Sequence, residues 1–101
     1  MRLALVLLVL SALAGCAASP APPFFGAQRQ QVTRGGHDYV LYRRGDRVEV
    51  IRLGYARPGE HRAIRATMLS LIPELTGCRP WKHSLHGDSG EMRGRLVCPA
   101  G

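Results

Sequence analysis

The stretch DYVLYRRGDRVEVIRL, residues 38–53, decides the fold because it contains two β-rich runs separated by a short polar segment. The runs cover residues 38–42 and 48–53. Between them lie Gly45 and Asp46, two residue types that favour a turn. The stretch therefore predicts a β-hairpin.

The second run of this hairpin carries apolar residues on both faces. Val48 and Val50 share one face, whereas Ile51 and Leu53 share the other. Either a bulge shifts the register within the strand or both faces of the sheet are partly covered.

A helix is predicted after the hairpin, because the period of the apolar residues changes from Glu60 onward. Pro58 and Gly59 mark its start. Pro73 should end or kink it, since proline has no backbone N–H and its ring clashes with the preceding turn. The apolar positions recur at helical spacing, at Ile64, Met68, Leu71, Ile72 and Leu75.

Two further strand-like runs follow, at residues 81–86 and 91–98, with the turn-forming sequence of residues 87–90 between them. In the second run, Met92 and Leu96 share one face and charged residues share the other, as in a half-buried strand. The predicted order is ββαββ. The predicted fold class is therefore α+β, a small two-layer domain in which one amphipathic helix covers an antiparallel sheet.

The beginning of the chain has the layout of a secretory signal. Residues 1–15 contain one positive charge, an apolar stretch and then small residues. The apolar stretch is too short to remain in a bilayer as a spanning helix. We therefore expect residues 1–15 to be a cleaved signal peptide.

The sequence Leu13-Ala14-Gly15-Cys16 ends this segment and resembles the lipobox of bacterial lipoproteins. The resemblance covers only the first 16 residues. It implies cleavage before Cys16, a diacylglyceryl group on the sulfur of Cys16, and a membrane anchor of several acyl chains, which attaches a protein stably. The alternatives are an ordinary signal peptide followed by a free cysteine, or an uncleaved apolar N-terminus.

The residues after Cys16 suggest where such a protein is sorted and where its domain begins. Ala17 and Ala18 occupy the place where an aspartate would retain a lipoprotein at the inner membrane, so we expect an outer-membrane protein facing the periplasm. Residues 16–31 contain three prolines and predict a tether. The folded domain is predicted to cover residues 32–101.

Cys78 and Cys98 are predicted to form a disulfide. Each is ten residues from Asp88, in the middle of the last predicted turn, so a symmetric hairpin places the two cysteines opposite each other. An exported protein also meets an oxidising compartment. Two free thiols are the alternative. Trp81 is expected to pack on the disulfide and the helix.

The chain is basic, with 14 basic residues, seven acidic residues and a formal net charge of +7. A basic surface favours anionic partners, which in a cell envelope are lipid, glycan or protein, and no nucleic acid is expected. Such a surface can instead serve only to prevent edge-to-edge pairing. Five arginines in or after the first hairpin predict a basic edge, namely Arg43, Arg44, Arg47, Arg52 and Arg57.

Two patterns that resemble chemical sites have simpler explanations. Residues 87–90 match the four letters around the nucleophile of chymotrypsin-like proteases, but those enzymes need two barrels and separate histidine and aspartate motifs. His83 and His86 would suit a metal on a helix, but on a strand they point to opposite faces. The sequence thus predicts no catalytic residue, no metal and no cofactor.

The resulting functional hypothesis is a membrane-anchored envelope lipoprotein with a non-enzymatic binding or structural role. The alternative hypothesis is an inhibitor or accessory subunit of an envelope enzyme or assembly machine.

Overall fold

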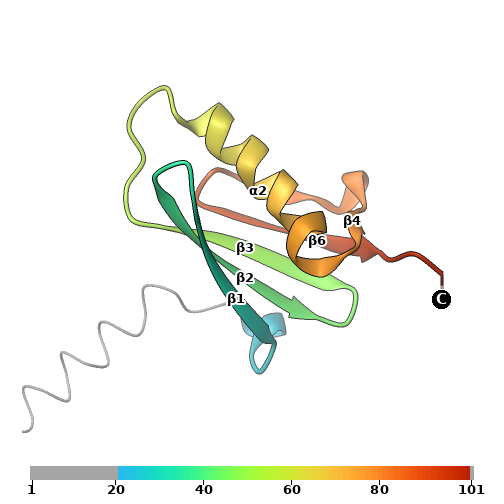
Figure 1. Cartoon of the computed structure of the whole chain (residues 1–101). Helices are drawn as coiled ribbons and strands as arrows, with labels where there is room; N and C mark the ends of the chain where they lie inside the picture. Colours follow the sequence, from blue (N-terminus) through green and yellow to red (C-terminus); the bar gives the residue numbers. More distant parts are fainter. Residues whose placement is uncertain (1–20, 101) are drawn as a thin grey trace, which may run out of the picture.

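The structure is a computed structural model that describes residues 21–100. The predicted signal peptide and the predicted lipidation site at Cys16 lie outside the described residues. In the described chain, an antiparallel sheet has the strand order β1-β2-β3-β6-β4, and β5 also pairs with β6. The helix α2 lies across one face of this sheet (Figure 1). The elements are η2 (Pro22–Phe24), β1 (Gln28–Arg34), β2 (His37–Arg44), β3 (Arg47–Leu53), α2 (His61–Thr76), β4 (Arg79–Pro80), η3 (Lys82–Ser84), β5 (His86–Gly87) and β6 (Glu91–Val97).

The predicted α+β class, with one helix on an antiparallel sheet, is confirmed, but the ββαββ order is matched only loosely. Half of the run predicted as a strand at residues 81–86 forms η3, and only His86 belongs to a strand. The Trp81 backbone N–H donates to the carbonyl of Arg95 at 2.8 Å, and the Arg95 N–H donates to the Ser84 hydroxyl at 2.8 Å. A side chain thus takes the place of a backbone partner, which interrupts strand pairing along β6.

The strand β1 lies at the edge of the sheet and was not predicted. It joins β2 through Gly35 and Gly36, whose φ angles are 60° and 82°, as a two-residue hairpin turn requires. Val32 alone in β1 is apolar, so an edge strand exposed on both faces shows no apolar alternation. The predicted tether of residues 16–31 is therefore wrong in its extent, since Gln28 already belongs to the sheet.

The main core lies between α2 and the sheet. The predicted apolar face of the helix is confirmed, because Ile64, Met68, Leu71 and Ile72 are all buried. These side chains pack against a layer contributed by β2, β3, β6 and the segment after α2, namely Tyr39, Leu41, Val48, Val50, Cys78, Met92 and Leu96.

Of the two effects expected of Pro73, an end or a kink, the first is wrong, because the helix continues to Thr76. The missing N–H of Pro73 removes only the helical bond to the Leu69 carbonyl, and the turn beyond Pro73 keeps bonds of its own. The Thr76 hydroxyl donates to the Ile72 carbonyl, and the Gly77 N–H donates to the Pro73 carbonyl at 2.9 Å. Gly77 ends the helix in the left-handed conformation, with φ of 72°.

The opposite side of the sheet, called the far face here, holds a second and smaller apolar cluster. Val40, Tyr42, Ile51 and Leu53 lie there, and η2 covers them with the side chain of Phe24, which is 4% exposed. The β2–β3 register runs without interruption from Asp38↔Leu53 to Arg44↔Arg47. Coverage of both faces, and no bulge, therefore explains the two-sided apolar pattern of β3.

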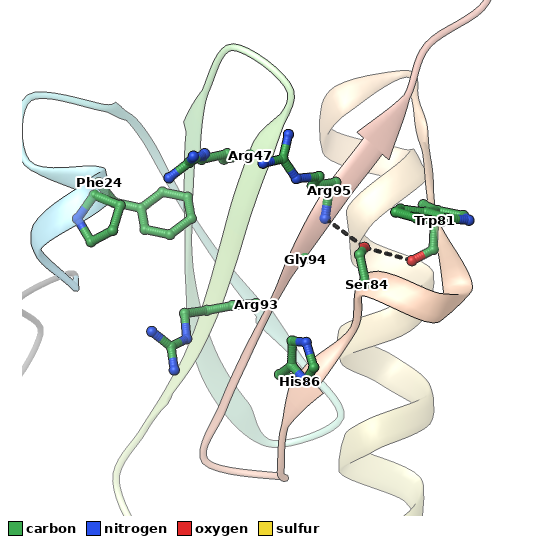
Figure 2. Close-up of a pocket in the computed structure, with 9 residues that line it drawn as sticks. Phe24, Arg47, Trp81, Ser84, His86, Arg93, Gly94 and Arg95 are labelled. Carbon is green, nitrogen blue, oxygen red and sulfur yellow. Dashed lines mark hydrogen bonds between the residues drawn. The ribbon is translucent and has the colours of Figure 1, made fainter.

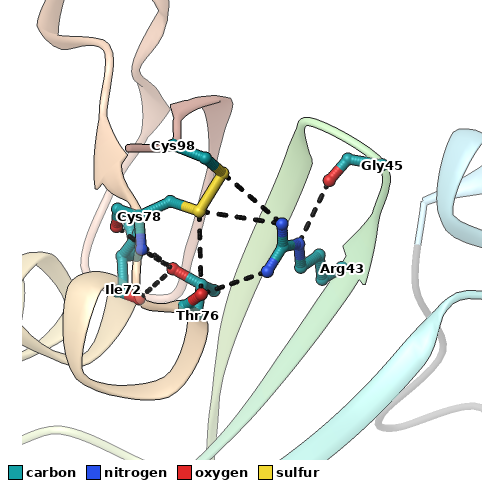
Figure 3. The surroundings of a disulfide bond; sticks show 6 residues. All are labelled: Arg43, Gly45, Ile72, Thr76, Cys78 and Cys98. Carbon is teal, nitrogen blue, oxygen red and sulfur yellow. Dashed lines mark hydrogen bonds between the residues drawn. A yellow bond between two sulfur atoms is a disulfide. The ribbon is translucent and has the colours of Figure 1, made fainter. Parts of the chain in front are cut away.

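The predicted disulfide between Cys78 and Cys98 is confirmed, with an S–S distance of 1.98 Å. It joins the segment after α2 to the end of β6 (Figure 3). The Arg43 side chain lies beside it, with Nη1 3.1 Å from the Thr76 carbonyl oxygen and Nη2 3.5 Å from the Cys98 sulfur. The loop of 20 residues that the disulfide closes should stabilise a small domain by roughly 3 kcal/mol in the chain-entropy model.

Phe24→Ala should lower the free energy of unfolding by about 3 kcal/mol, because truncating a buried phenylalanine leaves a cavity. Phe25→Ala is a matched control, since Phe25 is 59% exposed and its loss should change stability by no more than about 0.5 kcal/mol. Urea unfolding curves of the two variants measure the difference. Equally small effects would contradict the inclusion of η2 in the domain.

Candidate functional site

The five arginines of the predicted basic edge do not form one surface. Arg43 lies on the helix side beside the disulfide. Arg52 also lies on that side and donates to the Ser89 carbonyl at 2.8 Å. Arg57 belongs to the loop between β3 and α2, where its backbone N–H donates to Glu60. Only Arg44 and Arg47 share the far face, so the predicted edge is wrong as a set.

A different set of arginines gathers on the far face. Arg44 at the end of β2 is paired in register with Arg47 at the start of β3. Arg47 is in turn paired with Arg95 of β6. We call Arg44, Arg47 and Arg95 the arginine row. Arg93 lies on the same face, two residues from Arg95, in the next position along β6.

The two-residue turn between β2 and β3 produces one half of this row. Gly45 adopts φ of 59°, which lets Arg44 and Arg47 face each other across a two-residue connection. The other half comes from the pairing of β3 with β6. Local sequence patterns do not predict that these two strands are neighbours. Alternation along β6 predicts that Arg93 and Arg95 lie on the polar face of that strand. It does not predict that this face is the one that also carries Arg47.

The arginine row is only partly neutralised. Like charges directly opposite each other on neighbouring strands destabilise a sheet. Arg95 pairs with Asp46 at 3.2 Å, and Arg44 donates to the Phe25 carbonyl at 3.2 Å. Within residues 21–100, the Arg47 guanidinium has no hydrogen bond or ion pair. The row thus keeps an excess of positive charge and unused N–H donors.

Arg93 and Glu49 occupy the next register position of the far face. Arg93 Nε pairs with Glu91 at 3.0 Å, and the two terminal nitrogens of the Arg93 guanidinium have no partner among residues 21–100. Glu49 lies opposite Arg93 in register but is only 2% exposed, and its carboxylate accepts the Ala21 backbone N–H at 3.0 Å. Among the described residues, the buried carboxylate of this face thus accepts a hydrogen bond from the backbone at Ala21.

A hollow of about 440 Å³ lies over these arginines, between η2 on one side and η3 with β5 on the other (Figure 2). Trp81 is half exposed at its rim, so the expectation that Trp81 packs as core is wrong. The Trp81 backbone N–H donates to the Arg95 carbonyl, so residue 81 lies beside Arg95, at the end of the arginine row. The lining residues are Pro23, Phe24, Arg47, Trp81, Ser84, His86, Arg93, Gly94 and Arg95.

This arrangement suits an oxyanion. Guanidinium groups present planar sets of N–H donors that match phosphate and carboxylate oxygens. Arg47 offers all its donors, and Arg95 retains those not directed at Asp46. An exposed tryptophan at the rim adds a surface for a sugar ring or for the interfacial region of a bilayer.

Residues 87–90 bring a serine close to a histidine, since the Ser89 hydroxyl lies 2.6 Å from His61 Nδ1. Ser89 is only 7% exposed. The neighbouring carboxylates are directed elsewhere, Asp88 to the backbone of Gly90 and Glu60 to that of Arg57. A serine hydrolase needs an acid that orients the histidine and a nucleophile open to substrate. The contact instead ties the start of α2 to the last turn.

The four histidines of the chain, among them the metal-ligand candidates His83 and His86, are distributed over several elements. His83 lies in η3 and His86 in β5. His37 pairs with Glu60 at 3.3 Å at the start of β2, and His61 contacts Ser89. Among the residues that the structure describes, no three histidine, cysteine, aspartate or glutamate side chains gather as a metal site would require.

Comparisons with known proteins give no relative for this chain. No family model, curated protein or solved structure matches it significantly. In the part of the chain from residue 21 to residue 100, no helix has both the length and the apolar character needed to cross a bilayer.

The pKa of Asp88 is held below its ordinary value, chiefly because its carboxylate accepts the backbone N–H groups of Gly90 and Glu91. A lowered pKa stabilises the fold at pH values above the unfolded-state pKa, and this contribution is lost as the pH falls through the folded-state pKa. Asp88→Ala should therefore be less stable than the wild type at neutral pH. The difference in stability between the two proteins should shrink in acid. Urea unfolding midpoints measured from neutral pH to acidic pH test this. A difference independent of pH would contradict a role for the ionised carboxylate.

Proposed function

We propose that this chain is an envelope lipoprotein, anchored through lipid on Cys16 at the outer membrane and facing the periplasm, whose domain has a non-enzymatic binding role. The lipobox-like sequence that ends at Cys16 supports the anchor. The arginine row supports the binding role, and it is the observation that carries the proposal. The expected partner is anionic.

The arginine row supports a binding role because its concentrated positive charges do not stabilise the fold. Arg44, Arg47 and Arg95 lie opposite one another on three neighbouring strands, where their mutual repulsion opposes folding. An anionic partner removes this repulsion and uses the donors that remain unpaired. The Trp81 ring and the hollow beside it give such a partner a shaped surface.

Replacing Cys16 with serine should release the protein from membranes, because the proposed acyl chains attach to the cysteine sulfur. Fractionation of cells that express Cys16→Ser and wild-type protein measures this. The wild type should remain in the membrane fraction after a high-salt wash, whereas Cys16→Ser should not. Stable retention of both would contradict the anchor.

Replacing Arg47 and Arg95 together with glutamine should weaken retention of the detergent-solubilised protein on immobilised heparin, a sulfated glycan used here as an anionic probe. Arg62→Gln with Arg65→Gln is the matched control, because it removes two exposed arginines from α2 on the other side of the sheet. The salt concentration at elution should fall more for the first pair. Equal falls would mean that net charge alone, and not the arginine row, accounts for binding.

The role of inhibitor or accessory subunit is favoured by one observation. Within residues 21–100, β1 pairs only with β2, so the seven-residue strand Gln28–Arg34 presents an open edge to which a partner chain can add a strand. The backbone N–H of Gln31 lies at a non-hydrogen-bonded position of the β1–β2 pair and so points to this open edge. A single stoichiometric protein recovered from detergent-solubilised membranes, and lost on substitution of Gln31 by proline but not on substitution of Arg47 and Arg95, would favour this role over the first.

A further inference from the structure

The described chain enters the domain on the far face. The Ala21 backbone N–H donates to the Glu49 carboxylate at 3.0 Å, and Phe24 then packs against the apolar cluster of the same face. Glu49 follows Arg47 by two residues on β3, so both side chains lie on the same side of that strand. The entry point of the chain is therefore next to the arginine row.

Few residues separate this entry point from the proposed anchor. From Cys16 to Ala21 there are five residue steps, which span at most about 18 Å even when fully extended. A lipid on Cys16 would thus keep Ala21, and with it the far face, within about two Debye lengths of the headgroups at physiological salt. The domain has too little free chain to stand well away from the bilayer.

We propose that the far face lies on an anionic bilayer surface, with the arginine row contacting lipid phosphates and α2 directed toward the aqueous compartment. This inference rests on the proposed lipid anchor at Cys16. Two observations argue for a bilayer as the occupant: the short chain that ends on this face, and the charge of the row. Anionic leaflets attract arginines that lie close to the membrane.

The hollow also fits a bilayer surface. Trp81 and Phe24 lie on opposite sides of the arginines, and Trp81 exposes about half of its surface (Figure 2). Tryptophan is enriched at the boundary between lipid and water, where its ring is apolar and its N–H remains hydrated. The far face thus combines arginines that bind phosphates with an indole, and both kinds of side chain are suited to the headgroup level of a bilayer.

Trp81 is the only tryptophan of the chain, so its fluorescence reports on this face alone. The full-length protein is reconstituted into vesicles of phosphatidylcholine with phosphatidylglycerol, and into vesicles of phosphatidylcholine alone. With phosphatidylglycerol, Trp81 emission should shift to the blue and quenching by acrylamide should fall. Both effects should be lost in phosphatidylcholine alone and at high salt, because salt screens the attraction between arginines and headgroups.

The variants used for heparin binding serve again. Arg47→Gln with Arg95→Gln should lose the protection of Trp81, whereas Arg62→Gln with Arg65→Gln should keep it. Loss of protection only in the α2 variant would place the membrane against the helix and overturn the proposal. Protection by soluble heparin but not by anionic vesicles would also overturn it, in favour of a glycan partner.

Retention on the vesicles separates this inference from the proposed anchor. Wild-type protein that high salt removes from all vesicles would mean that the anchor itself is wrong. Protein that stays on the vesicles at high salt, but whose Trp81 is never protected, would overturn the orientation and leave the anchor intact.

Discussion

The antiparallel pairing of β6 with β3 joins the last strand of the domain to its centre. Pairing at Val50↔Met92 places the apolar side of β6 under α2 and completes the core. The same register carries Cys98 back to Cys78 and sets Arg95 opposite Arg47. A shift of one residue would reverse the two faces of β6, exposing Met92 and burying arginines. The core, the disulfide and the arginine row therefore all depend on one register.

The second constraint is the coverage of the far face. A sheet with one helix usually leaves its other face to water, yet β2 and β3 carry apolar residues on both sides. The segment from Ala21 to Ala27 resolves this by folding under the sheet, with Phe24 as its main apolar contact. This cover stops short of Arg47, so the same face is apolar at one end and cationic at the other. Such a division suits a surface that holds its own N-terminal segment and an anionic partner side by side.

Much of the fold could be predicted from local patterns. The spacing from Ile64 to Ile72 identified the buried face of α2, and the symmetry of the cysteines about Asp88 identified the disulfide. The strand β1 was missed because its sequence is polar apart from Val32. The signal that could have revealed it was the Gly35-Gly36 pair, a two-residue hairpin turn followed by the β-rich run of β2.

The candidate site was less accessible from the sequence. Arg44 and Arg47 could be assigned to the first hairpin, but the partners of β3 are set by pairing between residues nearly fifty positions apart. Sequence proximity grouped Arg43 and Arg52 with them, although alternation along the strands sends these two to the helix side. Local spacing therefore predicted which arginines were close in the chain, and only the sheet order showed which were close in space.

The bond between Ala21 and Glu49 also determines how a mechanical load would enter the domain. A pull on the proposed anchor at Cys16 would reach the described chain first at Ala21, beside the central strand β3, and next at the buried ring of Phe24. These contacts must yield before tension reaches β1, which as an edge strand would otherwise separate from β2 one hydrogen bond at a time. With such an anchor, the N-terminal segment would thus take up tension before the edge strand β1 does.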